Sequence, residues 1–190
     1  MLDLSPRSRL AVGIALAVLL AVTRGHHFSD LNLPSASWAV FFLAGMLLPA
    51  RWAFPVLFLE AVALDLVAVT WGGVSSWCVT PAYGLLLPAY ASLWLGGRLY
   101  ARLHRDAWSS LASLLACVLA ASFVCHLLSS GGFYFFSGRY PEASLAGFLP
   151  RIVAYYPQSL QALALYVGMA ALLLAAVHAF KQLRRVEVSR

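Results

Sequence analysis

The sequence predicts an all-α integral membrane protein with six transmembrane helices and both termini on the cytoplasmic side. Of its 190 residues, 62% are hydrophobic and only 11% are charged, whereas soluble domains carry about 25% charged residues. Apolar stretches close to the roughly 20 residues that cross a bilayer recur from end to end. Lys and Arg are concentrated beside these stretches. No internal repeat or low-complexity linker divides the chain, so we expect a single domain over 1–190.

The first expected span covers 9–24. Basic residues followed by an apolar run are similar to a signal peptide, but Thr23-Arg24-Gly25-His26 follows in place of a small-residue cleavage site, so we expect a retained helix. Small side chains recur in pairs four residues apart along it: Ala11 with Ala15, Gly13 with Ala17, and Ala17 with Ala21. Such residues let helices approach closely in lipid. They indicate either internal packing or a docking surface for another membrane subunit.

The other expected spans are 36–50, 52–72, 81–103, 107–128 and 152–180. The second and third are joined by almost no loop, as in an antiparallel helix pair. Pro88 predicts a kink in the fourth, because proline removes a backbone donor. Longer loops are expected at 25–35, 73–80 and 129–151.

The basic residues predict the orientation, because cytoplasmic loops of membrane proteins are enriched in Lys and Arg. With the N-terminus inside, three basic residues lie outside, Arg24, Arg139 and Arg151, and ten lie inside: Arg7, Arg9, Arg51, Arg98, Arg102, Arg105, Lys181, Arg184, Arg185 and Arg190. Basic residues near both termini require an even number of spans. The net charge of +6 does not indicate nucleic acid, since the charges lie beside spans and not in one patch. All three longer loops then lie on the outer side.

Two carboxylates, Glu60 and Asp65, fall inside the third span. An aspartate at the centre of a membrane helix costs about 2.5–3.5 kcal/mol, so it usually faces a partner or a cavity. Asp65 is expected in the outer half of the span and Glu60 deeper. Five residues separate them, about 500° around a helix, so they do not share a face. For each, a structural hydrogen bond to a neighbouring helix and a functional role both stay open.

Cys78 lies in an outer loop rich in glycine and serine, which permits close approach of a ligand to the backbone. Three interpretations stay open: an inert small side chain, a disulfide with Cys125 in an oxidising compartment, and a thiolate ligand for a transition metal. Cys117 is expected to be a packing residue. The adjacent pairs Cys125-His126 and His26-His27 do not by themselves define a metal site.

Aromatic side chains are frequent in the last outer loop and the sixth span: Phe133, Tyr134, Phe135, Phe136, Tyr140, Tyr155 and Tyr156. They are typical of a belt at the membrane surface, or could pack on a large flat ligand together with Trp77 and Tyr83. No C-x-x-C, H-E-x-x-H or phosphate-binding glycine motif is present. An ATPase on this chain is therefore excluded.

A six-span chain of this length, with an alanine-rich first span and elaborated outer loops, resembles the substrate-binding S-components of energy-coupling factor (ECF) transporters. Asp65, the Trp77-Cys78 loop and Tyr83 are more narrowly similar to the BtuM-type members, which bind vitamin B12. The resemblance implies cobalamin as bound substrate, with Cys78 as the axial cobalt ligand and Asp65 and Tyr83 as supporting residues. We add His26, Trp77 and Arg151 to the expected cobalamin site from position only.

The resemblance further implies a multi-pass protein of the bacterial inner (cytoplasmic) membrane that carries its substrate inward. Its partners would be an ECF transmembrane subunit and two ATPases, contacted through Ala11, Ala15, Ala17 and Ala21 of the first span. With cyanocobalamin, ligation by the Cys78 thiolate would promote loss of cyanide, which makes Cys78 a candidate catalytic residue.

Two alternatives belong to other functional classes. A membrane sensory or anchoring module would detect a ligand with its outer loops and signal through its basic tail. An integral membrane enzyme would use Glu60, Asp65 and His126, but it needs these polar groups at one depth, and Glu60 is expected deeper than the other two.

Overall fold

The computed structural model describes residues 5–24, 33–105 and 109–188, and this part of the chain is helical throughout apart from its connecting segments. Its elements are α1 (Pro6–Arg24), α2 (Ser37–Leu47), α3 (Ala53–Thr70), the short 3₁₀ helices η1 (Ser76–Cys78) and η2 (Pro81–Leu85), α4 (Leu86–Leu103), α5 (Ser109–His126), the π-helical turn η3 (Leu127–Gly131), α6 (Gly132–Phe136) and α7 (Leu145–Val188). The expected all-α fold class is therefore confirmed.

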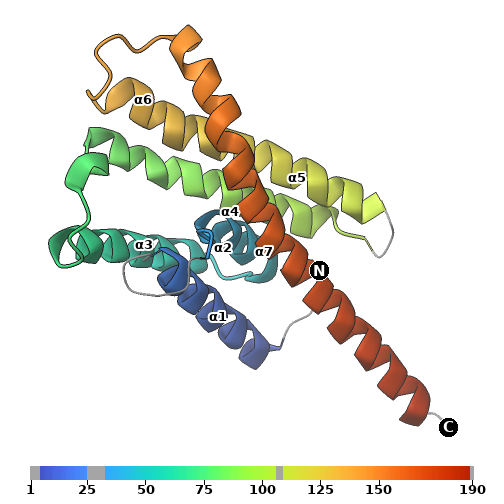
Figure 1. Cartoon of the computed structure of the whole chain (residues 1–190). Coiled ribbons are helices and arrows are strands. Elements are labelled where there is room, and N and C mark those ends of the chain that lie inside the picture. Colours follow the sequence, from blue (N-terminus) through green and yellow to red (C-terminus); the bar gives the residue numbers. More distant parts are fainter. Residues whose placement is uncertain (1–4, 25–32, 106–108, 189–190) are drawn as a thin grey trace.

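Helix α2 lies in the middle of the bundle and contacts α1, α3, α4 and α7 (Figure 1). Most of its residues are buried, including Phe41 and Phe42. A helix that is apolar on all sides is suited to such a central position. Its 11 residues measure only about 16 Å, roughly half of a hydrocarbon core of about 30 Å.

Two glycines bring the backbones of α2 and α4 into direct contact. A Cβ atom on Gly45 would meet the carbonyl oxygen of Trp94, and one on Gly97 would meet the carbonyl oxygen of Phe42. Between helices in lipid there is no water to exclude, so close packing of this kind holds them together. Beside this contact, the Phe41 ring stacks on the Tyr90 ring, with centroids 4.4 Å apart.

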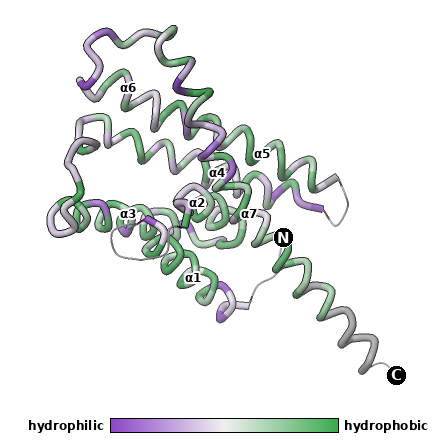
Figure 2. The backbone as a smooth tube through the Cα atoms, viewed as in Figure 1, coloured by the Kyte–Doolittle hydropathy of each residue, from purple (hydrophilic) through white to green (hydrophobic). Residues whose placement is uncertain are grey.

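Four helical segments of the described chain are long and apolar enough to cross a membrane: Pro6–Arg24, Ala53–Thr70, Ser110–Phe136 and Leu145–Val177. Figure 2 shows that hydrophobic residues dominate these segments. Large apolar side chains also point outward, as on α1, where Leu10, Ile14 and Val18 are more than half exposed. An apolar exterior is suited to lipid. The chain is thus an all-α protein built for multi-pass insertion into a membrane.

The expected spans 36–50 and 81–103 are not among these four segments. Helix α2, of 11 residues, is shorter than a full crossing, and α4 carries Arg98 and Arg102 in its last two turns. Six crossings therefore stay a prediction. Pro88, where we expected a kink, lies in the first turn of α4 directly after η2. Backbone N–H groups in the first turn of a helix have no partner within the helix, so the N–H that proline lacks is not missed there.

The expected loop 129–151 is largely wrong. The helical path continues from α5 through η3 and α6 to Phe136, and α7 begins at Leu145, so only 137–144 is left between helices. The hydroxyl of Ser129 donates to the carbonyl oxygen of Cys125 at 2.7 Å. The serine is thus accommodated within a helix by a bond back to the preceding turn. Helix α7 also contains Pro150 and Pro157.

The close contact between α2 and α4 yields a prediction about stability. Gly97→Ala should lower the thermal stability of the detergent-solubilised protein, because overpacking of this kind costs about 1–3 kcal/mol. Gly168→Ala is the matched control, since nothing lies within 4 Å of its added Cβ in α7. Its melting temperature should stay unchanged or rise slightly. Size-exclusion chromatography after heating measures both, and equal melting temperatures would contradict the contact.

Candidate functional site

A charged pair joins the C-terminal end of α1 to the C-terminal half of α3. Arg24 Nε donates to Asp65 Oδ1 at 2.7 Å, and Arg24 Nη2 donates to Asp65 Oδ2 at 2.6 Å. The side chains are only 12% and 28% exposed. Two parallel, charge-assisted hydrogen bonds of this kind fix the relative orientation of the two side chains and also attract them strongly. Asp65 therefore has a cation that offsets the cost of placing a carboxylate in a span.

Three hydroxyl groups complete this arrangement, which we name the Arg24 cluster: Arg24, Ser37, Asp65, Tyr83 and Tyr90. Arg24 Nη1 donates to Ser37 Oγ at 2.9 Å and to the Tyr90 hydroxyl at 2.8 Å. The Tyr83 hydroxyl donates to Asp65 Oδ2 at 2.6 Å. One guanidinium and one carboxylate thus connect α1, α2, α3, η2 and α4.

The Arg24 cluster also holds together the two ends of the segment that carries Cys78. Asp65 precedes this segment and Tyr83 follows it, so their hydrogen bond joins its two flanks. Within it, Gly73 has a φ of +67°, a left-handed conformation that glycine adopts without strain. Ser75 Oγ accepts from the backbone N–H of Trp77 at 3.2 Å and starts η1. The backbone of Cys78 therefore lies in a short, anchored turn.

Two expected site residues fall wholly or partly outside the described structure. His26 lies in 25–32, outside the described residues, although it is only two positions from Arg24. The backbone of Cys78 is described as part of η1, while its side chain is not. The structure thus places the turn that carries the expected cobalt ligand and leaves the sulfur itself undescribed.

Trp77 connects the Cys78 segment to the connection between α6 and α7. The guanidinium carbon of Arg139 lies 4.3 Å from the centroid of a Trp77 ring, which is a cation–π contact. Trp77 itself is 51% exposed. An aromatic face of this side chain is therefore on the surface beside Cys78.

Arg151 lies in an aromatic group formed by α6, the following connection and α7. Its Nη2 donates to the Tyr140 hydroxyl at 2.9 Å, and its guanidinium carbon is 4.8 Å from the Tyr140 ring and within 5.5 Å of the Tyr134 and Tyr155 rings. No contact in the described part of the chain joins Arg151 to the Arg24 cluster. The two are related through α6, which packs against η2.

These groups share one end of the molecule. Figure 1 shows the turn after α3, η2, α6 and the connection to α7 on the same side, while the start of α1, the end of α4, the start of α5 and the end of α7 lie on the other. Asp65, Trp77, Tyr83 and Arg151 thus belong to one end, but only Asp65 and Tyr83 are in direct contact.

The remaining candidates do not form a metal centre in the described structure. Among the described residues no group of three or more His, Cys, Asp or Glu could hold an ion. Cys117 and Cys125 are free and buried, so Cys125 is not the disulfide partner considered for Cys78. His126 is 1% exposed and packs against the rings of Trp38 and Tyr156. Glu60 is half-buried and has no hydrogen-bond or ion-pair partner in the described part of the chain.

Sequence reasoning missed the cation of this site. Arg24 counted only among the basic residues on the expected outer side, and its partner is 41 positions away. The available signal was Asp65 itself, because a carboxylate in a span calls for a cation nearby. Arg24, at the end of the first expected span, is a basic residue on the same expected side as Asp65. Nothing in the sequence indicated that Ser37 and Tyr90 would also contact this cation.

The two carboxylates of α3 allow a matched test of the Arg24 cluster. Asp65→Asn should destabilise the protein by about 1.5–3 kcal/mol, the range for hydrogen bonds to charged groups. Glu60→Gln makes the same chemical change on the same helix and should leave the melting temperature unchanged or higher, since it breaks no contact in the described structure. Thermal unfolding in detergent measures both. A larger loss of thermal stability for Glu60→Gln than for Asp65→Asn would contradict the assignment of Asp65 as the paired carboxylate.

Comparison with known proteins adds no assignment to this geometry. Neither a scan against protein-family models nor a search of curated proteins gave a match. The family is therefore not shown by these comparisons. What supports a function is the arrangement of Arg24, Asp65 and Tyr83 around the Cys78 segment.

Proposed function

We propose that this protein binds cobalamin at the outer face of a bacterial inner membrane and takes it up as an ECF-type S-component. The thiolate of Cys78 is the axial cobalt ligand. The observation that carries the proposal is the hydrogen bond between Asp65 and Tyr83, which joins both flanks of the Cys78 segment. The residues that resemble the BtuM-type proteins thus meet around one turn. A preorganised turn lowers the cost of ordering a ligand site on binding.

Asp65 and Tyr83 act as positioning residues in this proposal. Asp65 accepts three hydrogen bonds, two from Arg24 and one from Tyr83. Because the carboxylate oxygens are hydrogen-bonded to these protein groups, the role of Asp65 is to hold the turn and not to ligate the metal. Trp77 offers an exposed aromatic face next to Cys78 for the flat corrin ring. Arg151 and its tyrosines supply a polar, aromatic wall at the same end of the molecule.

A thiolate is a soft ligand and suits a transition metal such as cobalt. When the substrate is cyanocobalamin, the Cys78 sulfur bonds to cobalt on the lower face as the bond from cobalt to the nucleotide base breaks, and a water molecule replaces cyanide on the upper face. The cyanide leaves with its electron pair, the thiol proton passes to solvent, and the oxidation state of cobalt does not change. Ligation on the lower face displaces the nucleotide base and produces the base-off form of the bound vitamin.

The proposed topology has six crossings, with both termini in the cytoplasm. The start of α1, the end of α4, the start of α5 and the end of α7 lie at one end of the molecule, which supports this topology. The Cys78 segment then faces outward. Uptake also requires an energising partner, an ECF transmembrane subunit with two ATPases. Ala11 and Ala15 are exposed on α1, beside Leu10 and Ile14, and form the expected contact surface.

A sensory or anchoring module is the second candidate, and one observation favours it. Helix α7 continues to Val188, beyond the end of its apolar part at Val177, and extends away from the bundle (Figure 1). A projecting helix is a means of attachment to another protein. The spectroscopic test below separates the two candidates, because a sensor of another ligand does not bind a corrinoid.

The visible absorption spectrum of purified protein incubated with cyanocobalamin tests the proposal. The wild type should retain a corrinoid with a base-off, thiolate-ligated spectrum and release cyanide. Cys78→Ala should lose the spectral change and the cyanide release, whereas Cys117→Ala, which removes a buried thiol within α5, should keep both. A Cys78→Ala protein that still binds cobalamin in the base-off form and still releases cyanide would contradict the proposal. A wild type that binds no corrinoid would favour the sensory module.

Tyr83→Phe separates positioning from ligation. It removes the hydroxyl that joins the flanks of the Cys78 segment, so cobalamin affinity should fall about tenfold, as for loss of one hydrogen bond to a charged group. The spectrum of the bound vitamin should stay unchanged because Cys78 is intact. Tyr155→Phe, which keeps the ring beside Arg151, should bind like the wild type. An altered spectrum with unchanged affinity for Tyr83→Phe would contradict a positioning role.

A further inference from the structure

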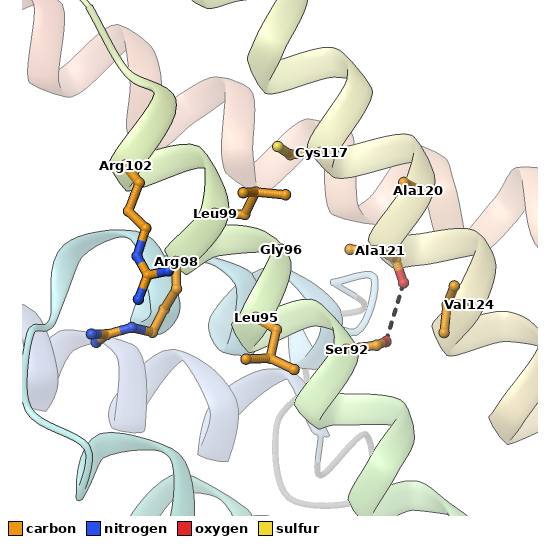
Figure 3. A pocket seen from close by; sticks show the side chains of 10 residues that line it. All are labelled: Ser92, Leu95, Gly96, Arg98, Leu99, Arg102, Cys117, Ala120, Ala121 and Val124. Atoms are coloured by element: carbon orange, nitrogen blue, oxygen red, sulfur yellow. Dashed lines mark hydrogen bonds between the residues drawn. The ribbon is translucent and has the colours of Figure 1, made fainter.

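A groove runs along the outside of α4 and α5, away from the Cys78 segment. It has a volume of about 490 Å³. Small residues form its floor, Gly96 on α4 and Ala120 and Ala121 on α5, while Leu95 and Leu99 line its side (Figure 3). Leu95 is 57% exposed and Leu99 is 50% exposed. The groove therefore opens to the surroundings of the bundle, which for a membrane protein are lipid.

Two arginines occupy one end of this groove. Arg98 and Arg102 are four residues apart on α4 and both line the groove, and their side chains extend to the side of the helix away from α5 (Figure 3). Arg98 Nη1 donates to the carbonyl oxygen of Pro49 at 3.2 Å, and its guanidinium carbon lies 5.1 Å from the centroid of a Trp94 ring. Arg98 is thereby held in place with most of its five donors still available.

Arg102 is exposed and has no hydrogen-bond or ion-pair partner among the residues that the structure describes. The acidic side chains described in the structure, Glu60, Asp65 and Glu142, do not line the groove. The groove thus combines an apolar floor with two positive charges at one end that no described carboxylate balances. Its complement is a molecule with an apolar chain and an anionic head.

The length of the groove matches one leaflet of a bilayer. From Ser92 to Arg102 the helix rises about 15 Å, which is half of a hydrocarbon core of about 30 Å. An acyl chain lying along Gly96 and Ala120 would therefore bring its phosphate to the depth of Arg102. Long arginine side chains also reach from an apolar surface toward the headgroups.

We propose that this groove binds one anionic phospholipid, with an acyl chain between α4 and α5 and the phosphate on Arg98 and Arg102. In the proposed orientation the lipid belongs to the cytoplasmic leaflet, which carries the anionic lipids. The bound lipid would cover the surface of α4 where Arg98 and Arg102 interrupt its apolar residues. The inference requires only that the bundle lies in a membrane, and it is independent of cobalamin.

Native mass spectrometry of the detergent-purified full chain tests the lipid site. The probes are palmitoyl-oleoyl phosphatidylglycerol and palmitoyl-oleoyl phosphatidylcholine, which differ in headgroup charge and share their chains. The wild type should bind one phosphatidylglycerol at least about tenfold more tightly than phosphatidylcholine, as expected for a charge-assisted hydrogen bond. Arg102→Gln should remove this preference. Arg9→Gln, which deletes the same charge from an exposed position on α1 outside the groove, should keep it.

A second variant separates the groove from the charges. Ala120 is exposed on α5, so Ala120→Phe fills the groove without burying a new side chain in the bundle, and it should weaken the binding of both lipids severalfold. Equal binding of the two lipids by the wild type would overturn the proposal, as would an unchanged preference in Arg102→Gln. Displacement of phosphatidylglycerol by millimolar inorganic phosphate, together with no effect of Ala120→Phe, would show a phosphate site in place of a lipid site and would also overturn it.

Discussion

A carboxylate placed among apolar helices must find a cation, and the bidentate pair between Arg24 and Asp65 meets this requirement. Because the guanidinium has five donors in a fixed plane, it also reaches Ser37 and Tyr90, while Asp65 keeps a lone pair for Tyr83. Each of these residues comes from a different element. The position of the Cys78 segment, and with it the proposed site, therefore depends on an ion pair that does not include Cys78, the expected cobalt ligand.

This electrostatic connection gives the helices a specificity that apolar packing alone does not provide. Hydrophobic burial does not distinguish one helix face from another when the solvent is lipid. Deeper in the bundle, contact of α2 with α4 through Gly45 and Gly97 provides the tight packing. At the end that carries the Cys78 segment, hydrogen bonds to charged groups provide the specificity. The two devices act at different depths on the same pair of central helices.

The sequence predicts the helices well and the connections poorly. Long apolar runs without breakers predict α1, α3 and α7 because length and hydropathy are local properties. The helical continuation through η3 and α6 was missed, since Ser129 and the following glycines look like a loop until the bond from Ser129 to Cys125 is known. The cobalamin site stays a prediction. Asp65 and Tyr83 are hydrogen-bonded to each other, and both were expected in it. Arg24 was not, because its partner is remote in sequence and the contact depends on how α1 packs on α3.

Helix α7 behaves mechanically as a rod. Its 44 residues measure about 66 Å, and the part after Pro157 extends about 46 Å without a proline. That length exceeds the thickness of a hydrocarbon core. When a rigid body tilts, displacement grows with distance from the pivot, so the far end of this rod moves farther than any side chain in the bundle. A reorientation of the protein within its membrane is therefore amplified at the C-terminal end of α7.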